Sequence, residues 1–388
     1  MKHPASVRSF RSKLSAVVGA LALTATLAPA SADAPHGFLE TLHRQTTLTS
    51  TITPNGDLNP YAVIVAPVSS GTIRKGDVLV DNFNNQSNLQ GTGTTIVDYD
   101  PVSKKTTTFA TLPRQIPGCP GGVGLSTAMT MLTSGWVIVG STNSTDGTTR
   151  TKAAGCLIVL DSSGKLATTW TGPNINSPWG NMATLDRGGT ATLFVSMAGF
   201  DVPGPEVHDP ATGSSVTVKK AIVLRLDLTI PSGKPPAIAN QTIVANGLGE
   251  RADTDSFLIG PTGLALGADG TLYVSDALTN AIVKIPDATT RTTSAGTGDV
   301  ITKDGLLRRP LSLVMTPGGN LVACNALNGQ IVEIDPRTGK QLSAQWIDVD
   351  QAQTPPGNGD LFGMAIMPDG RGLYYIEDDV NALVEDVP

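Results

Sequence analysis

The chain has 388 residues, with 42 glycines, 27 prolines, 4% aromatic and 15% charged residues. The formal net charge is −6 and the basic residues do not cluster in the body of the chain, so nucleic acid and anionic membrane surfaces are poor partners. No long amphipathic helix is evident after the first forty residues, so the composition is typical of many short strands joined by tight turns.

The first 32 residues have the organisation of a signal peptide. A basic stretch at positions 2–13 precedes an apolar run at 14–27, and Ala30-Ser31-Ala32 fits a cleavage site. The apolar run is too short to span a bilayer comfortably, so membrane insertion is not expected. We therefore expect an exported protein, periplasmic or extracellular, with a short N-terminal extension at 33–44.

A strand–turn–strand–loop–strand pattern recurs along the second half of the chain. It is clearest at 260–285, where Ala268-Asp269-Gly270 marks the tight turn. The pattern returns at 310–334 and at 361–376. Units of this size cannot bury their apolar faces alone and must stack on neighbours.

Six such units can be aligned on the first apolar residue of their second strand. These anchors are Val78, Val137, Leu193, Leu272, Leu321 and Leu373. The spacing predicts an all-β, six-bladed β-propeller over 45–388, interrupted by insertions at about 199–217 and 229–258 that we expect to be loops. The last unit lacks a fourth strand, and 46–52 is expected to supply it and to close the ring.

The repeats resemble the NHL family of six-bladed propellers, most specifically at 260–285. The chain is also distantly similar to gluconolactonase-like and strictosidine synthase-like propellers. In gluconolactonase-like enzymes, Asn and Asp ligands at the entry of the innermost strands hold a divalent cation. The corresponding ring in this sequence reads Tyr61, Thr127, Trp179, Thr262, Leu311 and Phe362. These residues cannot supply carboxylate ligands, and no catalytic residue is assigned.

A second ring follows the second strand of each unit. It reads Asn82, Ser141, Met197, Asp276, Asn325 and Glu377, with Asp81, Asp378 and Asp379 beside it. Asp81, Asp276 and Glu377 are candidate ligands for a divalent cation, Ca²⁺ or Zn²⁺, and no other cofactor is expected. Alternatively, Asp and Asn at this position cap the turn into the third strand.

Aromatic residues with nearby amides make a candidate ligand site at one mouth of the channel. Tyr61, Trp179 and Phe362, with Asn181, describe either a pocket for a small molecule or sugar, or packing where the blades converge.

Three cysteines are too few for a disulfide scaffold. Cys119 and Cys156 belong to the same unit and can pair in an oxidising compartment, although spacing alone does not show that their Cα atoms are close.

The leading functional hypothesis is a non-catalytic binding module. Its ligand would be a small molecule or a partner protein, docked on the face that carries the channel mouth. The alternative is a metal-dependent, lactonase-like hydrolase or a lyase, with its site on the channel axis.

Overall fold

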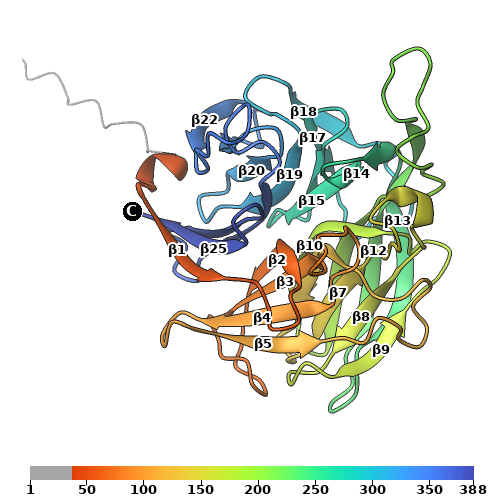
Figure 1. The fold of residues 1–388 in the computed structure, drawn as a ribbon, viewed down its shortest axis with the longest axis vertical. Helices are drawn as coiled ribbons and strands as arrows, with labels where there is room; N and C mark the ends of the chain where they lie inside the picture. The colour runs from red at the N-terminus through yellow and green to blue at the C-terminus, as the bar shows by residue number, and fades with distance from the viewer. Residues whose placement is uncertain (1–36) are drawn as a thin grey trace, which may run out of the picture. The chain divides into compact units, whose positions relative to one another are not determined.

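The computed structural model describes residues 37–388, which form six antiparallel sheets arranged as the blades of a propeller (Figure 1). This confirms the predicted fold. The predicted signal peptide and the start of the N-terminal extension lie outside the described residues. No described helix is long and apolar enough to span a membrane.

Blades 1 to 5 run from the innermost strand outwards in chain order, and blade 6 combines both ends of the described chain. Blade 1 contains β2 (Leu58–Val65), β3 (Val78–Asn84), β4 (Thr95–Asp100) and β5 (Lys105–Thr111). Blade 2 contains β6 (Leu125–Met131), β7 (Val137–Ser141), β8 (Cys156–Leu160) and β9 (Leu166–Trp170). Blade 3 contains β10 (Pro178–Asp186), β11 (Thr190–Met197), β12 (Val218–Thr229), β13 (Ala237–Asp253) and β14 (Phe257–Ile259).

Blade 4 contains β15 (Pro261–Leu266), β16 (Leu272–Asp276), β17 (Ala281–Ile285) and β18 (Asp299–Lys303). Blade 5 contains β19 (Pro310–Met315), β20 (Leu321–Asn325), β21 (Gln330–Ile334) and β22 (Gln341–Trp346). Blade 6 contains β23 (Leu361–Ile366), β24 (Leu373–Glu377), β25 (Ala382–Val387) and β1 (Arg44–Ser50).

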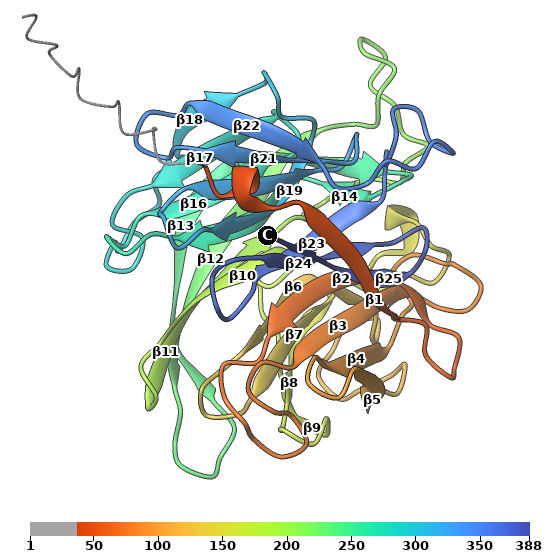
Figure 2. The ribbon, with the colours of Figure 1, turned by 90° about the vertical axis from the view of Figure 1, so that its left-hand side faces the viewer.

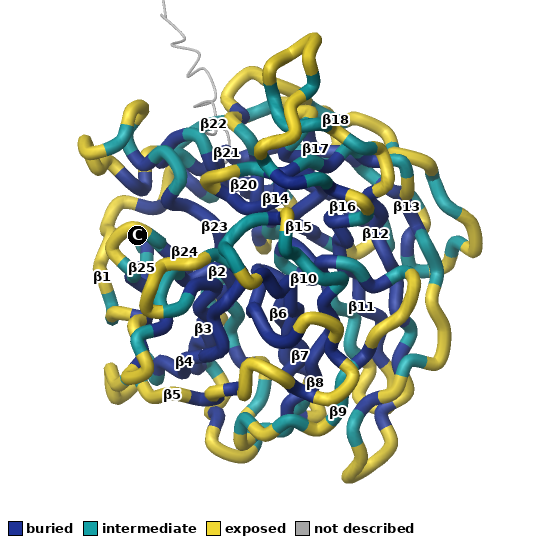
Figure 3. The backbone as a smooth tube through the Cα atoms, turned by 45° about the vertical axis from the view of Figure 1, so that its right-hand side comes forward, coloured by how far each residue is buried: buried dark blue, intermediate teal, exposed yellow. Residues whose placement is uncertain are grey.

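The inner strands of each blade are buried on both faces. Every residue of β3, β6, β7 and β8 is buried, and Figure 3 shows this continuous burial in dark blue. Antiparallel strands usually alternate between a buried face and a solvent-exposed face, but these strands are covered on both sides by neighbouring blades. The hydrophobic core therefore lies between neighbouring blades.

The N-terminal strand closes the ring, as predicted. β1 pairs antiparallel with β25, with Arg44 opposite Val387 and Ser50 opposite Ala382. The strand spans Arg44–Ser50 rather than 46–52. This pairing gives blade 6 its fourth strand and covers the edge of β25.

The residues before β1 attach to blade 5 through a buried carboxylate. A short 3-10 helix, η1 (Leu39–Thr41), contacts β22 (Figure 2). The Glu333 carboxylate on β21 accepts hydrogen bonds from the backbone N–H groups of Phe38 and Leu39, each at 3.0 Å, and from the Asn320 amide at 2.7 Å. Leu42 is buried and its carbonyl accepts a hydrogen bond from Gln345. The segment thus connects blades 5 and 6.

The expectation that 229–258 is a loop was wrong. It contains β13, a 17-residue strand that pairs with β12 and then turns back into β14. The outer strand of a blade faces solvent, so its Asn, Gln and Gly residues resemble a loop in composition. The other insertion, 199–217, holds only an isolated bridge between His208 and Ser215.

Cys119 and Cys156 form a disulfide, with their Cα atoms 5.2 Å apart. The bond links the connection that precedes β6 to the start of β8, within blade 2. Cys324 is a free, buried cysteine on β20, and its pKa is raised to about 12 by burial.

We expect Glu333→Ala to destabilise the whole ring. The change leaves the Phe38, Leu39 and Asn320 donors without their acceptor, at a cost of about 3 kcal/mol. Thermal unfolding followed by circular dichroism should show a lower Tm, and proteolysis near residues 37–43 should be faster. Asp299→Ala, at an exposed position of β18, is the control. Equal Tm values for both variants would contradict this account of ring closure.

Candidate cation site

The innermost strands approach so closely that they leave little space on the axis. A Cβ atom at Gly180 would lie 1.8 Å from the carbonyl oxygen of Thr262, and one at Gly363 would lie 2.4 Å from that of Tyr61. Only glycine permits such contacts. The cavity that these strands enclose measures about 10 Å³. It has room for about one water molecule.

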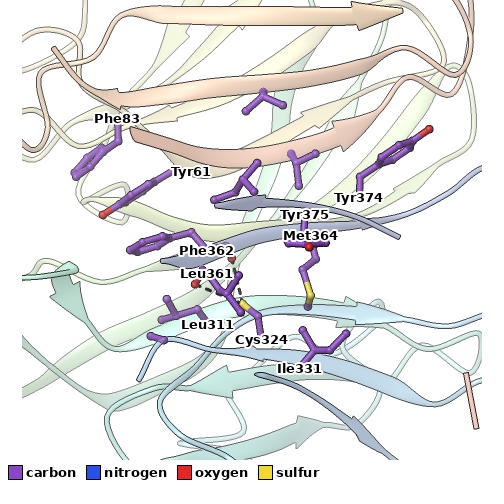
Figure 4. Packing of buried hydrophobic residues seen from close by; sticks show 14 of the residues in the cluster. Tyr61, Phe83, Leu311, Cys324, Ile331, Leu361, Phe362, Met364, Tyr374 and Tyr375 are labelled. Carbon is purple, nitrogen blue, oxygen red and sulfur yellow. Dashed lines mark hydrogen bonds between the residues drawn. The ribbon is translucent and has the colours of Figure 1, made fainter. Parts of the chain in front are cut away.

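The predicted aromatic ligand site is a packed stack. Tyr61 lies between Phe83 and Phe362, with ring centroids 4.3 and 4.1 Å from its own (Figure 4). The Trp179 ring meets the Tyr61 ring edge-on, with centroids 5.9 Å apart. Tyr61, Trp179 and Phe362 are 0%, 1% and 3% exposed. The structure brings these three residues together as predicted, but as a closed cluster rather than as the lining of an open mouth.

The Asn181 side chain is occupied by contacts with neighbouring blades. Its Nδ2 donates to the carbonyl oxygens of Leu264 and Leu313 at 2.9 and 3.0 Å. Its Oδ1 accepts from Ser312 Oγ and Leu313 N, both at 3.1 Å. These four hydrogen bonds use the amide fully and join blade 3 to blades 4 and 5.

A hairpin from blade 3 covers the channel mouth, and the sequence did not predict this hairpin. The hairpin links β13 to β14, and Asp253 at its start forms an ion pair of 3.4 Å with Arg309 of blade 5. The Gln90 side chain of blade 1 donates a hydrogen bond to the Thr254 carbonyl at 2.9 Å. The ring centroids of Phe257 and Phe83 are 5.5 Å apart. Blades 1, 3 and 5 alternate around the ring, so a hairpin that contacts all three lies over the axis.

The three predicted metal ligands are not brought together. Asp81 Oδ1 accepts the Ala62 N–H at 2.8 Å, and burial raises the pKa of this carboxyl well above its usual value. Asp276 caps its turn by accepting hydrogen bonds from Leu278 N and from the Thr279 backbone and hydroxyl. Glu377 lies at the end of β24, next to a different group of acids.

That group consists of Asp348, Asp360 and Asp379, called here the acidic cluster. One carboxylate oxygen from each lies within 4.8 Å of the others, and among the described residues no other group of three potential metal ligands meets this criterion. Asp348 follows β22, Asp360 precedes β23, and Asp379 lies in the turn between β24 and β25. The cluster therefore lies where blade 5 crosses to blade 6, on the face that carries the channel mouth, the top face.

Backbone hydrogen bonds fix both ends of the crossover. Ile347 N and Asp348 N donate to the Gly329 carbonyl at 2.8 and 3.0 Å. Asp378 N donates to the Asp360 carbonyl at 3.0 Å. A Cβ atom at Gly329 would lie 1.9 Å from the Asp348 carbonyl oxygen, so glycine is needed for this close approach. The acidic cluster thus has a preformed backbone.

Burial and like charge both disfavour the ionised acids. Burial raises the pKa of Asp360 to about 7, and Asp379 and Asp348 add to the effect. Burial, Asp348 and Asp379 likewise raise the pKa of Glu377 to about 7. No ion pair among the described residues involves any of these acids.

Several oxygens at the cluster have no hydrogen-bond donor. Asp348 and Asp360 are 6% and 5% exposed, and Oδ2 of each is buried without a partner, as is Gln353 Oε1. Buried acceptors without donors are costly, and hard cations with oxygen ligands satisfy them. The sequence carried a signal in the acids at 348–350 and 377–379, but only the fold brings these two segments together.

No protein-family model matches the chain, and no curated protein sequence is similar to it. Solved structures match in fold. A gluconolactonase from Xanthomonas campestris has a TM-score of 0.53 at 13% identity, over 89% of this chain and 90% of its own. Regucalcin from Agrobacterium tumefaciens, a calcium-binding protein, has a TM-score of 0.53 at 14% identity, over 89% of this chain and 95% of its own.

A luciferin-regenerating enzyme has a TM-score of 0.51 at 14% identity, over 85% of this chain and 93% of its own. The structural neighbours thus include gluconolactonase-like six-bladed propellers. At this level of identity the likeness shows the fold, and proteins of this fold differ in activity.

We expect stability without divalent cations to fall as pH rises from about 5 to about 8. The pKa values of Asp360 and Glu377 are about 7 in the folded chain. Unfolded, such groups titrate near about 4, so folding takes up protons in this window and the stabilisation is lost as pH passes about 7. Thermal unfolding in chelator across this range measures the slope.

Asp360→Asn should reduce that slope only in part, because burial also raises the pKa values of Glu250 and Asp98, to about 8 and about 7. Asp255→Asn, an exposed acid on the same face, should leave the slope unchanged. An equal slope in all three proteins would show that the cluster does not govern this pH dependence.

Proposed function

We propose that this chain is a non-catalytic binding module that holds Ca²⁺ at the acidic cluster and uses the ion to bind a small molecule or a partner protein on the top face. One observation carries the proposal. Three carboxylate oxygens lie within 4.8 Å of one another, and Asp348 and Asp360 each have a buried oxygen without a hydrogen-bond partner.

Charge balance supports a divalent cation. Two buried, unpaired carboxylates beside a third are unfavourable when ionised, because their repulsion is poorly screened and their hydration is lost. They can be neutralised by protons, which the raised pKa of Asp360 reflects, or by a cation. A divalent ion balances two carboxylate charges at once.

The ligand atoms favour Ca²⁺ over Zn²⁺. The cluster offers only oxygens, from Asp348, Asp360 and Asp379, and the buried Gln353 Oε1, which has no hydrogen-bond partner, is a further candidate. Zn²⁺ prefers His and Cys, whereas Ca²⁺ accepts six to eight oxygens. Asp379 is exposed, so the solvent side of the site is open to an oxygen of a bound partner.

A second candidate is a metal-dependent, lactonase-like hydrolase or a lyase. The pKa values of Asp360 and Glu377, each about 7, are suited to general acid or base chemistry beside a cation. The packed aromatic stack leaves no room for such a site on the axis, so it would also lie at the crossover.

We further propose that the repeats are of the NHL type and that the protein is exported to the periplasm or the medium. The Cys119–Cys156 disulfide supports export, because such bonds persist in oxidising compartments. The mass of the protein recovered outside the cytoplasm should correspond to a chain that begins at Asp33. Recovery of the full-length chain in the cytoplasm alone would refute export.

Isothermal titration with CaCl₂ tests the cation site, with MgCl₂ and ZnCl₂ as competitors. We expect one Ca²⁺ per chain, and at least about tenfold weaker binding by the Asp348→Asn/Asp360→Asn double variant. At a Ca²⁺ concentration of about 100 times Kd, the native protein should gain about 2.7 kcal/mol. The control is Asp255→Asn, which removes one negative charge from an exposed loop of the top face.

The double variant should fold, since it relieves repulsion between buried acids. Absence of Ca²⁺ binding by the unaltered protein, or equal affinity in the double variant, would overturn the proposal. Calcium-dependent hydrolysis of δ-gluconolactone that the double variant lacks would favour the enzymatic alternative instead.

A further inference from the structure

A trough on the face opposite the acidic cluster has the chemistry of a saccharide site. It lies between blades 2 and 3, below the β6–β7, β8–β9 and β10–β11 turns, and has a volume of about 430 Å³. Trp136 provides an aromatic wall, and Ile230 of the β12–β13 connection is part of the lining. The volume of this Trp136 trough is far larger than that of the axial cavity and lies in the range of small-ligand pockets.

The walls of the trough are held in place by hydrogen bonds between blades. Asp186 Oδ2 accepts from Thr133 N at 2.6 Å and from Thr133 Oγ1 at 2.9 Å, while its Oδ1 accepts from Gly188 N at 2.7 Å. One carboxylate thus fixes a turn of blade 2 against a turn of blade 3. Ile230 N donates to the Gly189 carbonyl at 2.9 Å, which positions the β12–β13 connection.

Blade 1 supports the same wall from outside. Thr72 donates through its N–H and its hydroxyl to the Ser162 carbonyl, at 3.0 and 3.1 Å. Three turns and the β12–β13 connection therefore form the trough, and a connection of blade 1 supports it. A preformed site of this kind lowers the entropic cost of binding.

The polar groups around Trp136 have unused hydrogen-bonding capacity. Within the described residues, the hydroxyls of Ser134, Ser162 and Ser232 make no hydrogen bond with the protein. Asp161 accepts three hydrogen bonds at Oδ1, from Ser163 and Lys165, which leaves its Oδ2 available. Three hydroxyls and a carboxylate oxygen next to a half-buried indole can bind a ring that is apolar on its face and hydroxylated at its edge.

We propose that the Trp136 trough binds an uncharged saccharide. A sugar ring would stack its C–H face on Trp136, and its hydroxyls would bond to the three serines and donate to Asp161. The carboxylate disfavours anionic ligands. This inference is independent of the cation proposed on the top face.

Titration of the full chain with cellotriose, maltotriose and triacetylchitotriose, each followed by calorimetry, tests the proposal. We expect at least one to bind with a Kd of about 1 mM or lower, and Trp136→Ala to weaken that binding at least about tenfold. Trp346→Ala removes a 42% exposed indole from blade 5 and should bind like the unaltered protein.

Trp136 also packs against the core between blades 2 and 3, so a second variant is needed to distinguish loss of the binding site from loss of the fold. Ser134→Ala/Ser232→Ala removes two hydroxyls that the fold does not use and should weaken binding several-fold at an unchanged Tm. Chelator should not affect saccharide binding. No binding of any of the three sugars at about ten times the expected Kd, or binding that both variants retain in full, would overturn the proposal.

Discussion

Every other feature of this structure depends on closure of the ring. Each blade has two apolar faces, and a strand such as β8 is buried throughout because a blade covers it on either side. An open row of blades would expose one such face at each end. The pairing of β1 with β25, and the Glu333 carboxylate that holds the preceding segment, are therefore contacts on which all six blades rely.

Closure also explains where binding can occur. At the axis, glycines such as Gly180 and Gly363 let backbones touch, and the stack of Tyr61, Phe83 and Phe362 occupies the remaining space. The hairpin that bears Phe257 then covers the mouth. Where blade 5 crosses to blade 6, in contrast, Asp348 and Asp360 each keep a buried carboxylate oxygen without a partner. Ligand sites in this propeller are therefore expected away from its axis.

The fold could be predicted because it is encoded in local patterns: the strand spacing gave six blades, and the short last blade gave the closing strand. The candidate site could not be. Asp276 and Glu377 occupy equivalent repeat positions, yet one caps a turn and the other joins a group of acids. That difference arises from the crossover, which places Asp348 beside Asp379. Likewise β13 resembled a loop, because an outer strand needs no apolar pattern.

The position of β1 has a consequence for how the chain folds during synthesis. Arg44 pairs with Val387, so an early strand of the described chain finds its partner only when the end has been made. Until then the edge of β1 and the outer faces of the first and last blades have no cover, and unpaired edges of this kind invite aggregation. Contacts this distant in sequence also slow folding. Under the export proposed above, such late completion would favour translocation of the chain before it folds.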